Sequence, residues 1–154
     1  MSQNSTPVTS TNLSNLDLWA ARSSQAIVSK ALEELSSSDT AAQITETTKE
    51  QAKSVEILVT KTLGVIQENG IYAGMLYLLS RANKDKKIAE QIKLELLKLA
   101  NRIINGQDQQ PTEPPLPFLS EKICSDLDTL FLVKQLWEQT LIYARYGAKA
   151  QGKE

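Results

Sequence analysis

Histidine is absent from this chain of 154 residues, and cysteine occurs once, at Cys124. Without histidine the chain cannot build a Ser–His–Asp or Cys–His nucleophile, a histidine general base or the usual kind of zinc site. A single thiol also cannot form an intrachain disulfide or a thiolate cluster. From these absences we expect no enzyme activity, no bound metal and no cofactor.

Long apolar runs and an export signal are also missing. No apolar stretch reaches the roughly 18 residues that a membrane-spanning helix needs. The first twelve residues, MSQNSTPVTSTN, contain neither the basic nor the apolar region of a signal peptide. Together with the single cysteine, which is typical of a reducing compartment, these features predict a cytoplasmic protein.

Glycine (6 residues), proline (5 residues) and aromatic residues (5% of the chain) are scarce. This composition disfavours a β-sandwich or barrel and favours helices. Apolar residues recur at helical spacing in residues 16–35, 44–66, 88–103 and 127–148, and residues 71–82 are apolar on nearly all sides. We therefore predict an all-α fold, a compact bundle of five or six helices in which 71–82 is buried.

The domain boundaries follow from the polar and proline-rich segments. Residues 1–12 are rich in Ser, Thr and Asn and predict a disordered tail, which leaves residues 13–154 as a single helical domain. Four of the five prolines fall within 107–119, which predicts a semi-rigid extended connection rather than a helix. Ser120 is then positioned to cap a short helix, and Asp126 or Asp128 to cap the last one.

Several single residues have a structural interpretation. Trp19 and Trp137 lie on apolar stripes and are predicted to be core residues. We expect Tyr143 to lie in the core or an interface, whereas the sequence leaves the place of Tyr146 open. With no histidine to activate it, Cys124 is predicted to be an inert small apolar residue.

The net charge is −1, but the charges are unevenly distributed. Residues 81–102 contain seven cations and three carboxylates, and Arg145, Lys149 and Lys153 recur every four residues. Such runs usually form a solvated helix face, and this interpretation is favoured on charge alone. The alternative is a surface that binds a phosphate backbone, with Lys84, Lys87, Arg145 and Lys149 as the candidate RNA-binding residues.

Two segments carry a family resemblance. In VIQENGIYAGMLYLLSRA (65–82) a helix end and an Asn-Gly break precede an apolar helix, and the matching residues are Ile66, Asn69, Gly70, Leu76, Leu78, Leu79 and Ser80. In LWEQTLIYARYGAKA (136–150) the matching residues are Tyr143, Arg145, Tyr146 and Ala148. In this order and at this spacing, the segments resemble the small helical subunit of the Cmr complex, the type III-B CRISPR effector.

The resemblance implies a non-catalytic small subunit of a ribonucleoprotein that acts in antiviral defence. Its expected partners are the other subunits of the Cmr-type complex, copies of itself in the assembled filament, and crRNA-paired target RNA, which it would contact without reading sequence. The small subunit of the related type III-A complex shares this architecture and is a close alternative. The alternative from another class is a helical protein–protein adaptor with no nucleic-acid role.

Overall fold

The computed structural model describes residues 8–36 and 44–153, and within these ranges every regular element is a helix. The predicted all-α fold is thereby confirmed. The elements are α1 (Val8–Ser36), α2 (Ile44–Asn69), α3 (Ile71–Leu79), α4 (Lys84–Asn105), α5 (Pro115–Phe118), the π-helix η2 (Leu119–Ile123) and α6 (Leu127–Lys153). The break between α1 and α2, where the sequence predicts Ser38 or Asp39 as a helix cap, lies outside the described residues.

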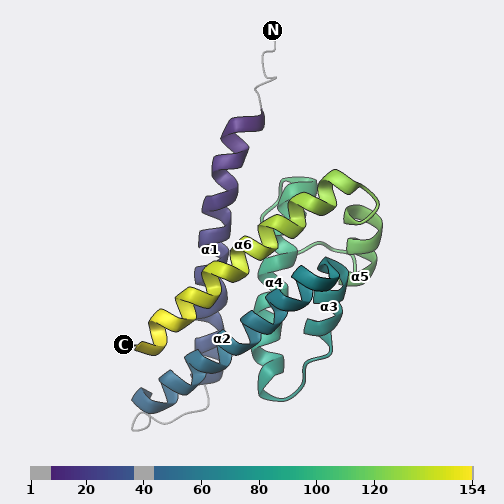
Figure 1. Cartoon of the computed structure of the whole chain (residues 1–154). Coiled ribbons are helices and arrows are strands. Elements are labelled where there is room, and N and C mark those ends of the chain that lie inside the picture. Colours follow the sequence, from purple (N-terminus) through teal and green to yellow (C-terminus); the bar gives the residue numbers. More distant parts are fainter. Residues whose placement is uncertain (1–7, 37–43, 154) are drawn as a thin grey trace.

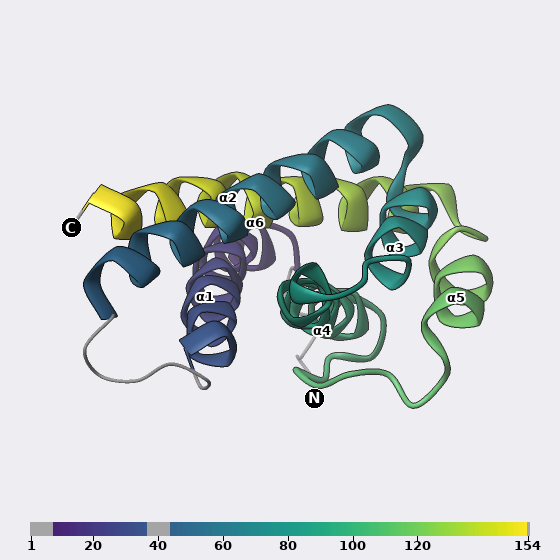
Figure 2. The same ribbon diagram turned by 90° about the horizontal axis from the view of Figure 1, so that it is seen from below.

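The helices form two layers. Helices α2 and α6 lie side by side and run in opposite directions, so that the start of α2 meets the end of α6 (Figure 1). Viewed from below, this pair covers α1 and α4, while α3 and α5 close one end of the molecule (Figure 2). The last helix of the chain therefore packs against the first two.

The core lies between these layers, on the stripes predicted from the sequence. Trp137 is fully buried, as predicted, and its indole Nε1 donates to the carbonyl oxygen of Leu96. One buried charge joins α1 to α4, because the carboxylate of Glu95 lies 3.4 Å from Lys30 Nζ and 3.7 Å from Lys98 Nζ. Other core side chains are Ile27, Ala31, Val55, Val59, Ile66, Ile88, Ile92, Val133 and Leu141.

Two glycines mark the breaks that the sequence predicts. Gly70 separates α2 from α3 with φ of 95°, a conformation that side chains rarely adopt. Gly106 ends α4 in the left-handed conformation, with φ of 72°, and its N–H donates to the carbonyl oxygen of Arg102 at 2.9 Å. At the start of α4, Asn83 also has a positive φ, of 59°, which asparagine tolerates better than most residues.

Both ends of the predicted domain organisation need correction. Helix α1 already includes residues 8–12, which the sequence assigns to the disordered tail, while residues 1–7 lie outside the described residues. The connection predicted over 107–119 ends at residue 114, because α5 begins at Pro115. Proline suits the first helical position, where its missing N–H would have no partner. Ser120 consequently lies inside η2 and caps no helix, whereas Asp126 does cap α6 by accepting from the N–H of Thr129.

Burial differs from the prediction at several apolar residues. Helix α3 is not buried on all sides, since Tyr72, Leu76 and Leu79 are exposed. Phe131 lies on the outer side of α6 although the sequence places it in the apolar stripe, and Cys124 is exposed. Trp19 is only partly buried, with the guanidinium carbon of Arg102 4.0 Å from its ring centroid.

Candidate nucleic-acid interface

The structure separates the four predicted RNA-binding residues into two places. Lys84 and Lys87 are exposed in the first turn of α4, at the lower edge of the molecule in Figure 1. Lys149 is exposed near the end of α6, at the opposite lower-left end of the same view. The two predicted pairs therefore do not form one continuous basic surface.

Arg145 is less accessible than predicted. Its side chain is partly buried, and its Nε is buried without a hydrogen-bond partner. Its guanidinium carbon lies 5.7 Å from the ring centroid of Tyr146, which is itself 59% exposed. This part of α6 therefore presents an exposed aromatic ring beside a half-buried cation.

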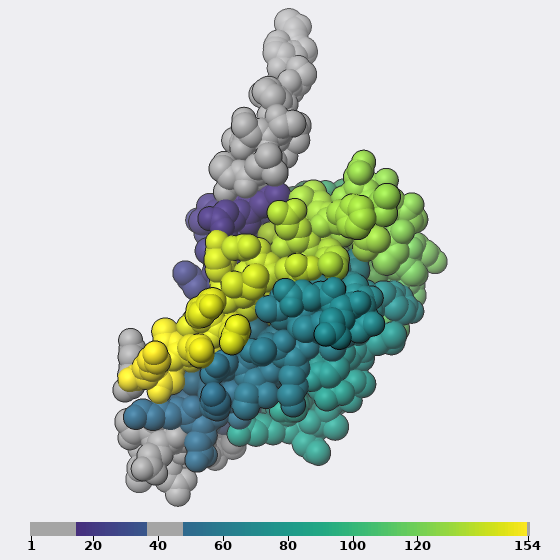
Figure 3. Space-filling model, in the orientation of Figure 1, coloured from purple at the N-terminus to yellow at the C-terminus, as the bar shows by residue number. Residues whose placement is uncertain are grey.

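A small groove between α2 and α6 brings together four lysines. Lys149 and Lys153 come from the end of α6, and Lys49 and Lys53 from the first turns of α2. Together with Glu56, Ala148 and Gly152 they line a cavity of about 220 Å³, which we call the lysine groove. The space-filling view shows these two helix segments in contact along their length (Figure 3).

Small residues let the two helices approach closely enough to form this groove. A Cβ placed on Gly152 would lie only 3.7 Å from the Cβ of Ala52, which is buried. On each helix the lysines are four residues apart, so each pair projects from one helix face. The groove is thus bordered on both sides by cations held on rigid elements.

The charge of the lysine groove is poorly compensated within the described residues. Its only carboxylate belongs to Glu56, which lies 3.6 Å from the Nζ of Lys53. The helix dipole explains Lys149 and Lys153, because cations are favoured at the end of a helix. It does not explain Lys49 and Lys53, which lie in the first half of α2. The cluster is therefore electrostatically unfavourable unless an anion occupies it.

Several other cations have a structural explanation. Lys30 and Lys98 pair with the buried Glu95, Lys93 pairs with Glu90, and Lys134 pairs with Glu138. Arg102 lies against Trp19 and 3.9 Å from Asp108. Part of the basic run over 81–102 is therefore used in intramolecular contacts, as the solvated-face interpretation predicts.

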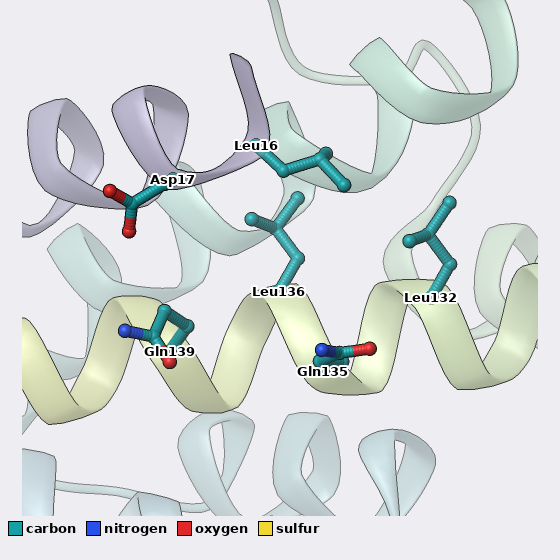
Figure 4. Close-up of a pocket in the computed structure, with 6 residues that line it drawn as sticks. All are labelled: Leu16, Asp17, Leu132, Gln135, Leu136 and Gln139. Atoms are coloured by element: carbon teal, nitrogen blue, oxygen red, sulfur yellow. The ribbon is translucent and has the colours of Figure 1, made fainter. Parts of the chain in front are cut away.

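A second cavity lies between α1 and α6 and is lined by Leu16, Asp17, Leu132, Gln135, Leu136 and Gln139 (Figure 4). Its volume is about 310 Å³. The carboxylate of Asp17 accepts a hydrogen bond from the phenol of Tyr143, and this bond raises the pKa of Tyr143. Since these six residues include no nucleophile with an adjacent base, this cavity is a weaker candidate site than the lysine groove.

Comparisons with known proteins add no assignment: no protein-family model, no curated protein and no solved structure matches the chain. In the described part of the chain, none of the helices has the length and apolar character needed to cross a membrane. Over the same residues, no group of three or more Cys, Asp and Glu side chains is arranged to hold a metal ion.

Only part of the lysine groove was predictable from the sequence. Lys149 is among the predicted RNA-binding residues and Lys153 recurs one turn later, but Lys49 and Lys53 are not among them. The spacing of four residues in each pair was a usable signal. The missing information was the pairing of α2 with α6, since residues about 100 positions apart become neighbours only in the fold.

Proposed function

We propose that this chain is a non-catalytic small subunit of a type III CRISPR RNA-targeting ribonucleoprotein, in which it contributes to assembly and contacts target RNA independently of sequence. The observation that carries the proposal is the lysine groove, with four lysines and one carboxylate. A phosphate backbone supplies the anions that such a groove lacks. The family resemblance of residues 65–82 and 136–150 supports the same role.

The surroundings of the lysine groove also favour a single-stranded nucleic acid over a small anion. Tyr146 is exposed and lies three residues before Lys149, so both side chains project from neighbouring positions on α6. Exposed aromatic rings beside a basic groove stack on unpaired bases without reading their identity. Lysine contacts to phosphate likewise carry no sequence information.

The test measures binding of the purified full chain to fluorescent single-stranded RNAs of two unrelated sequences at several salt concentrations. We expect the double variant Lys53→Gln/Lys149→Gln to weaken binding of both RNAs similarly. The slope of log affinity against log salt should flatten by about 0.7 for each lysine–phosphate interaction that the substitutions remove. A matched control, Lys61→Gln/Lys122→Gln, removes the same charge from exposed lysines outside the groove and should leave affinity nearly unchanged.

Two outcomes contradict the proposal. If the groove variant and the control bind equally tightly, the lysine groove is not the RNA site. If the parent chain binds neither RNA at low salt, the adaptor alternative becomes the better explanation. A third double variant, Lys84→Gln/Lys87→Gln, tests the other predicted pair separately.

A further inference from the structure

Two exposed apolar surfaces outside the lysine groove carry charges of opposite sign. The basic patch consists of Tyr72, Leu76 and Leu79 on α3 together with Lys84 and Lys87 on α4. The acidic patch consists of Glu121 on η2 together with Leu127, Asp128 and Phe131 on α6. Large exposed apolar side chains grouped beside charges usually mark a protein interface.

The basic patch is the unpartnered outer face of a helix whose inner face is in the core. Tyr72, Leu76 and Leu79 are 39%, 46% and 42% exposed, and their spacing of four and three residues places them on one side of α3. The opposite side carries the buried residues Ile71, Met75 and Leu78. Just beyond α3, residues 81–87 contain four cations and one carboxylate.

The acidic patch has the same construction with the charge reversed. Leu127 and Phe131 are 62% and 59% exposed, and they lie four residues apart on the outer face of α6. Asp128, three residues before Phe131, is exposed beside them, and Glu121 is exposed in the preceding η2. Residues 121–128 contain three carboxylates and one lysine.

We propose that the basic patch of one copy of this chain binds the acidic patch of a second copy. Each patch offers the apolar area and the charge that the other lacks, and such complementarity selects and orients a partner. The inference deepens the proposed function, in which copies of the chain are neighbours, and rests on it for that context. It also reassigns Lys84 and Lys87 from RNA binding to protein contact, because the leucines beside them need an apolar protein surface to cover them.

The positions of the patches make the contact intermolecular. The start of α6 lies at the upper right of Figure 1, whereas the turn between α3 and α4 lies at the bottom of the same view. One molecule therefore cannot join its own two patches. Because the two surfaces are different, the contact is head-to-tail, and it can continue from copy to copy instead of stopping at a dimer.

The first experiment reverses the charges of each patch in the full chain and measures self-association by sedimentation velocity. Variant one is Lys84→Glu/Lys87→Glu and variant two is Glu121→Lys/Asp128→Lys. We expect each variant alone to need at least about tenfold higher concentration than the parent to associate, because like charges then face each other. An equimolar mixture of the two should associate again, since each supplies the charge that the other no longer has.

The second experiment uses Cys124, which is exposed between η2 and α6, beside the acidic patch. Ser80→Cys adds a thiol beside the basic patch, so a bismaleimide crosslinker should produce a ladder of trimers and larger products. Thr60→Cys is the matched control, because it is an exposed helical hydroxyl on α2 that also bonds a backbone carbonyl oxygen, and it should give no ladder.

The outcomes separate this inference from the proposed function. A parent chain that stays monomeric at all concentrations overturns the inference and leaves both patches to a different protein. Reversal at Lys84 and Lys87 that abolishes RNA binding but preserves self-association also overturns it. Reversal that abolishes self-association while RNA binding persists supports it. Absence of an RNA effect at Lys53 and Lys149 contradicts only the proposed function.

Discussion

The indole Nε1 of Trp137 donates a hydrogen bond to the carbonyl oxygen of Leu96 at 2.8 Å, although the two residues are 41 positions apart. Both side chains are fully buried, so this bond connects the middle of α6 to the middle of α4 at the centre of the core. A buried indole needs such a partner, because an unpaired N–H away from water is costly.

We expect Trp137→Ala to lower the free energy of unfolding by about 3–5 kcal/mol, the usual cost of removing a buried aromatic side chain. Trp137→Phe keeps most of the apolar volume and should cost less. Urea denaturation followed by circular dichroism measures both. A Trp137→Ala variant as stable as the parent would contradict the central place of this residue.

The packing of α3 on α2 predicts opposite effects of the same substitution at two glycines. A Cβ on Gly74 would overlap the Cγ1 atom of the buried Ile66, so Gly74→Ala should destabilise the fold by about 1–3 kcal/mol. No atom lies within 4 Å of a Cβ on Gly64, so Gly64→Ala should stabilise α2 by about 0.4–1 kcal/mol. Thermal denaturation of the two variants checks the difference in sign.

The cap of α6 predicts a pH-dependent contribution to stability. Hydrogen bonds from the hydroxyl and then the N–H of Thr129 lower the pKa of Asp126 in the folded chain. The stabilisation is therefore present above the ordinary aspartate pKa of about 3.9 and is lost as pH falls through the lower folded value. Asp126→Ala should destabilise the chain at neutral pH, and the difference should shrink in acid. A difference that stays constant across this range of pH would contradict the assignment.

The lysine groove predicts a conflict between stability and RNA affinity. Replacing Lys149 with Gln removes its repulsion from Lys153 and from the lysines of α2, so the variant should gain about 0.3 kcal/mol per repulsive pair at low salt. The gain should diminish as salt is added, because the charges are exposed and screened. Urea denaturation at two ionic strengths measures this effect in the absence of RNA.

Much of the fold was predictable because helices are recognisable from their apolar spacing and from the residues at their ends. The stripes around Ile27, Val55, Ile92 and Trp137 are buried as expected, and the breaks at Gly70 and Gly106 are present. These features depend only on residues close in sequence, for which the physical rules are local.

The wrong predictions fall where tertiary packing decides the outcome. An apolar residue such as Leu76 or Phe131 has the same helical periodicity whether another helix covers it or not. Similarly, Pro115 resembles part of an extended connection until its position at a helix start is known. The lysine groove required knowledge that α2 and α6 are neighbours, and neither helix reveals this by itself.

The place of α6 in the architecture has a consequence for synthesis on the ribosome. The buried faces of α1 and α2 are covered by α6, which ends at Lys153. A nascent chain that has emerged as far as α4 must therefore keep two apolar helix faces exposed until the last segment leaves the exit tunnel. A premature stop codon before Trp137 would release a polypeptide in that state, which invites capture by chaperones and degradation by proteases.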